Sequence, residues 1–477
     1  MPVTVIRNAA WIVAYDTETG THTYLKDGDV AFDGDKIVHV GGTYTGEAET
    51  EIDGRDRLVS PGLVNIHSHP SSEAMNKGML DELGSPRLGM SSLYEYMPLF
   101  RCDAEGREAC VQVTYSELLK SGVTTLVDLS VNWDGWIDTF AASGLRGIVS
   151  PMYRSARWYT DNGHVVEYEW DEAAGKADMD AAVKTVEAAA NHPSGRLSGM
   201  ISPSQIDTCT PDLIADSFAL AQEKGLPFQI HAAQSVVEFT EITRRHGVTP
   251  LEWLDSLGVL KPGAIIGHGI FLNDYPHVFW PEAQDFKLLQ DSGAAVAHCP
   301  TVFQRRGIAM NTVGRYIRGG IPVGIGTDTY PHNMLEEMRS ALYLSRIMSK
   351  NPYDLRTSDI FDAATLGGAQ ILGREDIGRL AVGAKADLFL ADLTDPNMMP
   401  VRDPLRSLIY VAAERAVRDV FVDGRHVVVD GDVPAFDLPD ALARLEAAQR
   451  RAEEAFAKLD FAGRTHDEAS PYVYGQG

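Results

Sequence analysis

Cysteine is scarce in this sequence, and long apolar runs are absent. Four cysteines occur among 477 residues, at Cys102, Cys110, Cys209 and Cys299, and none of them forms a CxxC pair. This spacing excludes a disulfide framework and argues against a thiolate metal site. No apolar run approaches the roughly 20 residues that span a bilayer, and the N-terminus lacks the basic start and apolar stretch of a signal peptide. The sequence therefore predicts a cytoplasmic protein.

Positive charge is also in short supply. Acidic residues number 67 against 42 basic ones, so the net charge is −25. Such a surface repels phosphate backbones and anionic headgroups, which argues against nucleic acid and membranes as partners. Basic residues adjoin only in pairs such as Arg305-Arg306, and no larger basic cluster is visible in the sequence. A neutral or cationic small molecule is therefore the expected substrate, unless the fold builds a local basic pocket.

Both ends of the chain contain short runs of residues that favour β-strands. Short β-rich runs occur in the first 60 residues and return at 386–391 and 417–428. Asp27-Gly28, Asp33-Gly34 and Asp53-Gly54 are typical of hairpin turns, because glycine tolerates the positive φ that tight turns need. The sequence predicts one small β-sandwich built from both chain ends.

The middle of the chain repeats a strand followed by a helical stretch. The eight predicted strands are Leu63–His67, Thr124–Leu129, Gly147–Pro151, Leu197–Ile201, Pro227–His231, Ala264–His268, Ala294–His298 and Pro322–Thr327. Eight such units favour a closed parallel barrel over an open sheet. The predicted fold class is thus α/β, a (β/α)8 TIM-type barrel with a small β-sandwich. The predicted division is 1–59 and 381–435 for the β-sandwich, 60–380 for the barrel, and 436–477 for a C-terminal helix and tail.

Helix signals support this division. Thr210-Pro211 and Thr249-Pro250 each place a capping residue before a proline at the first helical position. Ser235 and Glu238 are spaced as a capping box. Residues 437–460 are rich in Ala, Glu and Arg, which predicts a solvent-facing helix. A homo-oligomer is expected, in which the tail could pack on a neighbour.

Polar residues gather at the predicted ends of the barrel strands. His67 and His69 follow the first strand, and side chains two apart on a strand point the same way. His231 ends the fifth strand, His268 ends the sixth, and Asp328 follows the eighth. Carboxyl ends of barrel strands converge on one pocket. An isolated HxH pair occurs often by chance, but five such residues at strand ends predict a site for one divalent metal, with zinc first and iron, cobalt or manganese as alternatives.

Six segments carry a resemblance to a known family. They are 61–69 (PGLVNIHSH), 122–128 (GVTTLVD), 267–268 (GH), 324–328 (GIGTD), 367–373 (GGAQILG) and 379–387 (RLAVGAKAD). With them, the chain resembles the amidohydrolase superfamily from about residue 5 to 430. The branch is similar to the one that holds cytosine, guanine and adenosine-type deaminases and triazine hydrolases. It also resembles the phenylurea and thiocarbamate (molinate) hydrolases.

The resemblance implies a role for each of the five residues. His67, His69, His231 and Asp328 would bind the metal, and His268 would assist the substrate. Two-metal members of the superfamily bridge their ions through a lysine after the fourth strand. This chain has Met200-Ile-Ser-Pro-Ser-Gln205 there, without a lysine, so one metal per chain is expected.

Gln234 departs from the pattern of the deaminases. They carry a glutamate three residues after the histidine of the fifth strand, and this chain has His231-Ala-Ala-Gln234. An amide cannot donate and accept a proton as a carboxyl group can. We therefore expect hydrolysis of an exocyclic C–N bond, of amide, urea or carbamate type, with Asp328 as the base, His268 as the group that polarises the substrate, and Gln234 as the group that orients it.

Two other interpretations stay open at this point. One is an aminohydrolase or chlorohydrolase that acts on a purine, pyrimidine or triazine ring. The other is a scaffold without activity, which metal analysis of the purified protein would distinguish.

Several further residues are candidates for the pocket wall. His298 and His332 follow the seventh and eighth strands, where a lining role is favoured over direct catalysis. Cys299 is expected to be a small packed residue. Tyr153, Arg154, Trp158 and Tyr159 follow the third strand and could form an aromatic wall.

Overall fold

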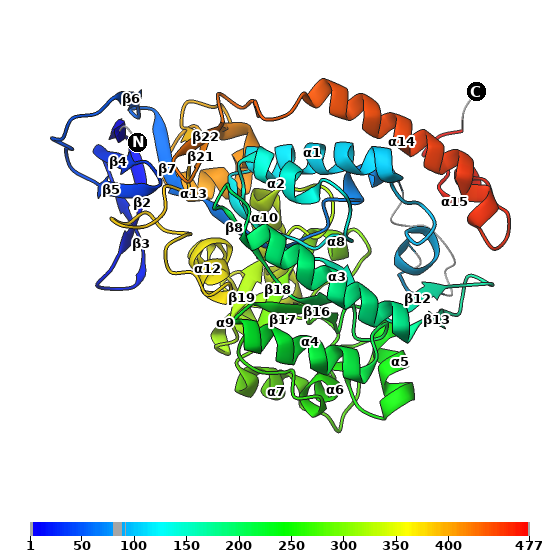
Figure 1. The fold of residues 1–477 in the computed structure, drawn as a ribbon. Helices are drawn as coiled ribbons and strands as arrows, with labels where there is room; N and C mark the ends of the chain where they lie inside the picture. The colour runs from blue at the N-terminus through cyan, green and yellow to red at the C-terminus, as the bar shows by residue number, and fades with distance from the viewer. Residues whose placement is uncertain (1–2, 80–87, 91, 476–477) are drawn as a thin grey trace.

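Strands and helices alternate through the middle of the chain, as the sequence predicts. The computed structural model describes residues 3–79, 88–90 and 92–475, and its fold is α/β (Figure 1). Eight parallel strands form two four-stranded sheets, in the orders β14-β10-β9-β8 and β16-β17-β18-β19. The strands are β8 (Leu63–Ser68), β9 (Val123–Asp128), β10 (Arg146–Val149), β14 (Leu197–Gly199), β16 (Phe228–Ala232), β17 (Ala264–His268), β18 (Ala295–His298) and β19 (Val323–Ile325). Each end lies within two residues of its prediction.

Further parallel bridges occur between residues that flank these strands. One joins Ile201 to Phe228, and another joins Ser68 to Asp328. The Asp328 bridge is held by backbone bonds, because the Asp328 amide donates to the carbonyl of His67 and the His69 amide donates to the carbonyl of Asp328, at 2.9 and 2.8 Å. The polar residues after β8 and β19 are thereby held side by side.

Helices cover the two parallel sheets. The longer ones are α1 (Ala104–Lys120), α2 (Trp136–Ser143), α3 (Glu172–Ala190), α4 (Pro211–Lys224), α5 (Val236–His246), α6 (Pro250–Ser256), α7 (Asp285–Ser292) and α10 (Met334–Ser349). The shorter ones include α8 (Pro300–Gln304), α9 (Val313–Arg318), α11 (Thr357–Asp362), α12 (Gly368–Ile371), α13 (Pro404–Ser407) and α15 (His466–Ala469). Two starts follow from their caps: Thr210 accepts a bond from the Leu213 amide, and Thr249 forms a capping box with Glu252.

The two chain ends meet in a small β domain. A six-stranded sheet, β22-β21-β20-β7-β2-β3, joins strands from both ends, and a four-stranded sheet, β5-β4-β1-β6, comes from the N-terminal end alone. These strands are β1 (Val3–Ala9), β2 (Trp11–Asp16), β3 (Thr21–Leu25), β4 (Gly28–Asp33), β5 (Lys36–Val40), β6 (Thr50–Asp53), β7 (Arg57–Pro61), β20 (Leu388–Asp392), β21 (Val417–Val422) and β22 (Arg425–Val428). Ile6 and Val30 of one sheet share an apolar cluster with Ile12 and Leu388 of the other.

Only one of the three predicted N-terminal hairpin turns is a hairpin. Asp33 pairs with Lys36 across the tight turn between β4 and β5. Asp27-Gly28 instead leads from β3 in one sheet to β4 in the other, and Asp53-Gly54 leads from β6 to β7 in the same way. Local sequence sets the turn conformation, but which strand pairs with which depends on side chains far along the chain.

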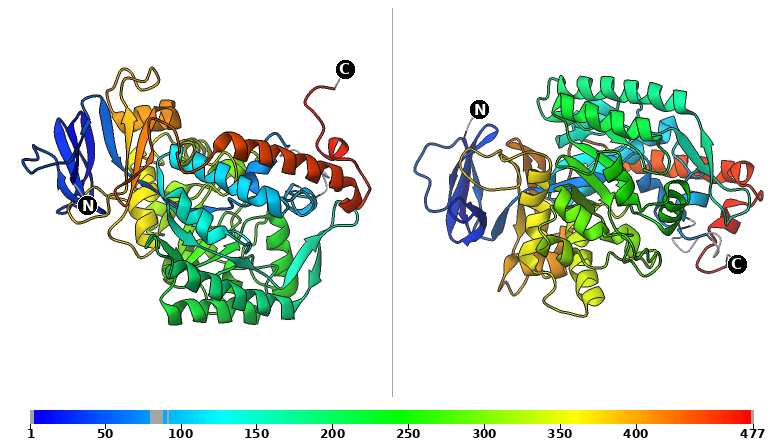
Figure 2. Two further views of the ribbon diagram at one scale, coloured as in Figure 1. Left: turned by 45° about the horizontal axis from the view of Figure 1, so that its top comes forward. Right: turned by 90° about the horizontal axis from the view of Figure 1, so that it is seen from below.

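The C-terminal helix is more buried than its composition predicts. Helix α14 (Leu438–Leu459) lies along α1, and Figures 1 and 2 show the two side by side. Ala441, Ala448 and Phe456 are buried, so only part of the helix faces solvent. The prediction of a solvent-facing helix is therefore wrong for the face of α14 that carries these three residues. None of the helices in the described residues has the length and apolar character needed to cross a bilayer.

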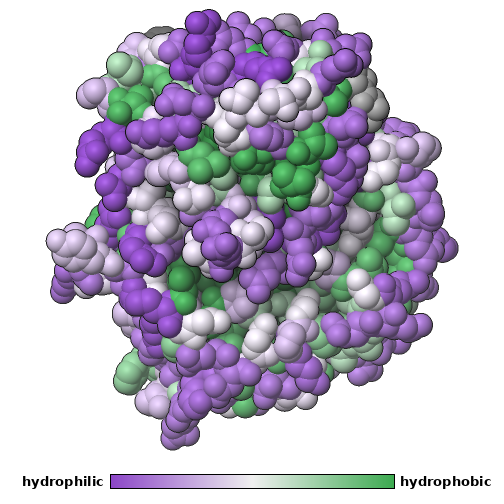
Figure 3. Space-filling model, turned by 90° about the vertical axis from the view of Figure 1, so that its left-hand side faces the viewer, coloured by the Kyte–Doolittle hydropathy of each residue, from purple (hydrophilic) through white to green (hydrophobic). Residues whose placement is uncertain are grey.

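Hydrophilic residues dominate the surface on the side of the small β domain, where apolar side chains show only as scattered patches (Figure 3). The four cysteines are all buried and free. Both observations agree with the acidic, disulfide-free protein that the composition indicates.

Candidate metal centre

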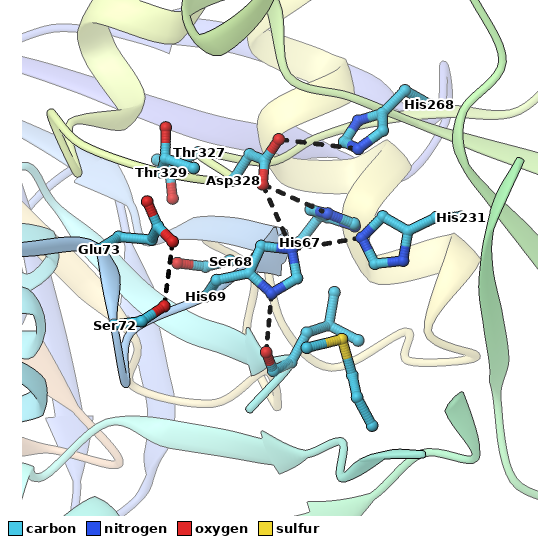
Figure 4. A network of polar contacts seen from close by, with 12 residues as sticks. His67, Ser68, His69, Ser72, Glu73, His231, His268, Thr327, Asp328 and Thr329 are labelled. Carbon is cyan, nitrogen blue, oxygen red and sulfur yellow. Dashed lines mark hydrogen bonds and ion pairs between the residues drawn. The ribbon is translucent and has the colours of Figure 1, made fainter. Parts of the chain in front are cut away.

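Five polar side chains converge where β8, β16, β17 and β19 end, and Figure 4 shows them facing one another. Asp328 Oδ1 lies 3.3 Å from His69 Nε2 and 3.8 Å from His67 Nε2. Asp328 Oδ2 lies 3.6 Å from His268 Nε2. His231 Nε2 lies 3.2 Å from His69 Nε2. The structure thus brings together all five residues that the strand-end argument selected.

Carbonyl groups fix the orientation of two imidazoles. His69 Nδ1 lies 2.8 Å from the carbonyl oxygen of Leu129, and His231 Nδ1 lies 2.6 Å from that of Ser204. A carbonyl oxygen only accepts, so each Nδ1 carries the hydrogen and each Nε2 carries a lone pair. Two such lone pairs at 3.2 Å repel one another unless a cation lies between them. This tautomer pattern is the one that metal-binding histidines adopt.

His67 is oriented by a residue that sequence reasoning missed. Gln229 on β16 donates through Nε2 to the Ile66 carbonyl at 3.0 Å, so its Oε1 accepts from His67 Nδ1. His67 Nε2 is buried without a hydrogen-bond partner among the described residues. A lone pair left in this way fits a metal ligand. Gln229 stands two residues before His231 on a buried strand, and that spacing was the available signal.

Burial keeps these imidazoles neutral. Loss of hydration and the proximity of His69 lower the pKa of His67 to about 3, against the opposing effect of the Gln229 hydrogen bond. The pKa values of His231 and His268 are lowered well below the usual value, again chiefly by burial. Neutral imidazole is the form that binds metal, so the side chains are ready to bind at neutral pH.

The donor set fits a divalent ion. His67, His69 and Asp328 form one group whose ligand atoms lie within 4.8 Å of one another, and His67, His231 and His268 form a second. Imidazoles with one carboxylate suit zinc and related first-row ions. Asp328 also has a left-handed backbone, with φ of 56°, and such unusual conformations cluster at functional sites.

Gln234 lies in the same cavity as His69, His231, His268 and Asp328. Its side chain lines the cavity, and its Nε2 is buried without a hydrogen-bond partner in the described part of the chain. The backbone amides of Ala233 and Gln234 donate to the two carboxyl oxygens of Glu238, at 2.6 and 3.2 Å. Glu238 therefore holds the backbone that presents Gln234.

The predicted capping box at α5 is only half formed. Ser235 accepts from the Glu238 amide at 3.0 Å, as expected. The Glu238 carboxyl group bonds to the amides of Ala233 and Gln234 instead of to that of Ser235. The glutamate reaches further back because the chain folds sharply after β16, where Ala233 has φ of 54°.

Glu73 is a second residue that the sequence analysis missed. It belongs to a 3-10 turn, η1 (Glu73–Asn76), lines the cavity and is 3% exposed. Ser72 Oγ and Asn76 Nδ2 donate to its carboxyl group at 3.0 and 3.3 Å. Burial raises the pKa of Glu73, an effect that His69 opposes and Asp328 reinforces. The structure therefore holds a second carboxyl group beside the histidines; its position four residues after His69 was the only signal.

The remaining candidates lie outside the centre or only partly in it. His298 borders a separate small cavity, and His332 is buried with Nδ1 3.4 Å from Ser68 Oγ; neither is among the residues that line the main cavity. Cys299 is buried, and burial raises the pKa of its thiol. Of the predicted aromatic wall, Trp158 does line the main cavity.

Two tyrosines of the predicted wall do not belong to it. Tyr153 is buried and donates to Ser217 Oγ at 2.7 Å, while Tyr159 is 43% exposed. Arg154, from the same segment, does line the main cavity, which has a volume of about 260 Å³. The sequence placed these residues in the right loop but could not decide which way each side chain points.

Comparison with known proteins agrees with this site. Residues 58–427 match the amidohydrolase family. The chain is 27% identical over 466 residues to a 5'-deoxyadenosine deaminase of Methanosarcina mazei, covering 96% of this chain and 99% of that one. It is 29% identical over 443 residues to a 5-methylthioadenosine/S-adenosylhomocysteine deaminase of Natronomonas pharaonis, covering 91% and 96%. The solved atrazine chlorohydrolase of Arthrobacter aurescens TC1, complexed with zinc, superposes with a TM-score of 0.77 at 22% identity, over 94% of this chain and 100% of that one.

The chain belongs to the amidohydrolase family. It is a metal-dependent hydrolase of carbon–nitrogen bonds, and the resemblance stated from sequence to the branch of deaminases and triazine hydrolases is confirmed. The interpretation as a scaffold without activity is not supported, because the donor set is complete.

Proposed function

We propose that this hydrolase cleaves an exocyclic C–N bond, of amide, urea or carbamate type, in a small molecule. One zinc ion would be held by His67, His69, His231 and Asp328. The observation that carries the proposal is Gln234, an uncharged amide with an unpaired Nε2 in the cavity. An exocyclic amide or urea needs its oxygen held and its nitrogen protonated, and neither demand requires a carboxyl group at this position.

The bound ion would supply hydroxide at neutral pH, since it lowers the pKa of water from near 16 to about 7. Asp328 accepts the proton of the attacking water and returns it to the leaving nitrogen, which is otherwise a very poor leaving group. His268 stabilises the charge that develops on the substrate oxygen. Gln234 donates from Nε2 to the substrate and orients it.

A second candidate is hydrolysis at a purine, pyrimidine or triazine ring. The names of the deaminase relatives favour it, and so does Glu73, a buried carboxyl group with a raised pKa in the cavity. A raised pKa favours the protonated form of a carboxyl group, and that form can donate to a ring nitrogen as hydroxide attacks. Glu73 would then perform the task for which Gln234 is unsuited.

Substrate panels distinguish the two candidates. We expect the native protein to release amines from amides, ureas or carbamates, and to deaminate adenosine derivatives, cytosine or melamine-type rings poorly. Gln234→Glu should weaken the native reaction, because it adds a negative charge beside the metal centre, and should permit some ring deamination. Both proteins are assayed on both classes at equal metal loading.

Gln205→Glu is a matched control for the added negative charge. It makes the same change at another residue that lines the cavity, after β14. Efficient ring deamination by the native protein without turnover of acyclic substrates would reject the proposal in favour of the second candidate. If Glu73→Gln then abolished the ring reaction at unchanged metal content, Glu73 would be identified as its acid.

Metal stoichiometry gives an independent test. We expect about one divalent ion per chain after gentle purification, because no lysine occurs in the segment 200–205 after β14. Elemental analysis of the purified protein, calibrated against amino-acid analysis, measures the ratio. A reproducible ratio near two would show that a second ion shares the centre.

We also propose that the eight parallel strands close into one barrel and that the chain divides into domains as the sequence predicts. The bridges Ile201 to Phe228 and Ser68 to Asp328 support a closed (β/α)8 barrel. The shared β sheet of both chain ends supports the division at residues 59, 380 and 435. The homo-oligomer and the cytoplasmic location stay predictions from sequence.

A further inference from the structure

Arginines gather in the cavity of this acidic protein. In the described part of the chain, the residues that line it include Arg101, Arg107, Arg154 and Arg306. They come from separate segments: Arg101 precedes α1, Arg107 lies in its first turns, and Arg154 lies between β11 (Met152–Tyr153) and β12 (Ala156–Tyr159). Only the tertiary structure places them together, which is why the sequence shows no basic cluster there.

Three of these side chains have no partner among the residues that the structure describes. Neither a hydrogen bond nor an ion pair joins the guanidinium of Arg101, Arg107 or Arg154 to any described residue. By contrast, Arg157 on β12 lies outside the cavity and is paired with Glu169. A guanidinium carries five N–H donors and is costly to bury without acceptors. Arg107 and Arg154 are half-buried, whereas Arg101 is exposed at the side of the cavity. The cavity therefore holds donors for which the described part of the chain provides no acceptor.

Positive charge is concentrated around Arg101. Loss of hydration, together with the charges of Arg154, Arg157 and Arg107, lowers the pKa of Arg101 to about 10. Burial likewise lowers the pKa of Arg154. Asp178 and Asp207 offset only part of the shift at Arg154. An anion between the two guanidinium groups would stabilise their cationic forms further.

The rest of the lining suits a small organic molecule. The metal centre contributes His69, His231 and Asp328 to the cavity, while Phe100 and Trp158 contribute apolar surface. A ligand that reaches both the metal centre and the arginines would carry a reacting C–N group, an apolar portion and an anionic group. Arginine suits oxyanions because its planar fork matches two oxygens at once.

We propose that Arg101 and Arg154 form a subsite for an oxyanion, carboxylate or phosphate, on the substrate of this hydrolase. The subsite deepens the proposed function and rests on it for the identity of the site. The net charge of −25 repels anions at long range, but the unpaired arginines reverse the field inside the cavity. The sequence predicts a neutral or cationic substrate unless the fold builds a local basic pocket. The arginines make this cavity such a pocket.

Hydroxamates of graded length provide the test. A hydroxamate chelates a metal through its two oxygens, and the other end of the molecule can carry a charge or none. The probes are the monohydroxamates of four-, six- and eight-carbon dicarboxylic acids, the matching alkyl hydroxamates, and a phosphonate series. Dissociation constants are measured by calorimetry on the metal-loaded protein. We expect an anionic probe of at least one length to bind about tenfold more tightly than its uncharged counterpart, as charge-assisted hydrogen bonds allow.

Variants assign the preference to individual arginines. Arg101→Gln and Arg154→Gln should each reduce the preference for the anionic probe about threefold or more, and the double variant should remove it. The uncharged hydroxamates should bind these variants as tightly as they bind the native protein. Arg157→Gln is the matched control, because it removes a nearby positive charge outside the cavity and should leave the preference intact.

The outcomes separate this subsite from the proposed function. Equal binding of anionic and uncharged probes at every length, or an equal loss in Arg157→Gln, overturns the subsite. Failure of the uncharged hydroxamates to bind contradicts the proposed metal centre. In that case the binding of adipate, a dicarboxylate that needs no metal, tests the arginines alone. Failure of adipate to bind in that case also overturns the subsite. A preference for the carboxylate or the phosphonate series identifies which oxyanion the subsite takes.

Discussion

Replacing Asp328 with asparagine should reduce turnover by at least about a hundredfold, because the amide keeps the shape of the side chain but cannot accept the water proton. Asp328 is placed for this role: its two carboxyl oxygens face His69 and His268, at 3.3 and 3.6 Å. His67→Ala should abolish turnover too, through loss of the metal. Steady-state rates on the best substrate of the panel measure both effects.

Metal content and folding must be followed in the same samples. Asp328→Asn should keep the circular dichroism spectrum of the native protein, and its rate is compared at equal bound metal. Asp134→Asn, at an exposed position, is a control that should leave the rate unchanged. A near-native rate in Asp328→Asn at full metal loading would show that another group is the base, and Glu73 would be the first to test.

The second large effect concerns stability, at the contact between the small β domain and the parallel strands. Arg146, the first residue of β10, donates to both carboxyl oxygens of Asp387 at 2.7 and 3.0 Å, and also to Asp423 at 2.7 Å. Arg146 is 3% exposed and Asp387 is 1% exposed. Asp387→Ala should therefore lower the free energy of unfolding by about 3 kcal/mol, since it leaves a buried guanidinium short of its main partner.

Urea unfolding followed by circular dichroism measures this loss. Asp291→Ala is the matched control: it removes an aspartate from an ion pair with Lys287 in which both side chains are more than half exposed. Exposed pairs of this kind contribute little, so that variant should unfold at the native midpoint. An Asp387→Ala protein with the native midpoint would contradict a stabilising role for the buried pair and would point to Asp423 as a sufficient partner.

The sequence alone determined the strands and the five central residues of the site. Each of the eight parallel strands is a short, largely apolar run, and its pattern does not depend on its neighbours. The five site residues could be found because the carboxyl ends of barrel strands meet at one face whatever the loops do. His67, His69, His231, His268 and Asp328 follow from that rule, and the structure brings them within reach of one another.

Tertiary structure decided what surrounds those residues. Gln229, Glu73 and the unpaired arginines Arg101 and Arg154 lie on segments that no strand-end rule connects. Pairing of β3, β4, β6 and β7 across two sheets, and burial of one stripe of α14, were likewise not readable from local turns and composition. The physical reason is the same in each case: turn and helix propensities are local, whereas sheet partners, buried faces and cavity charge depend on contacts between residues that are far apart in the chain.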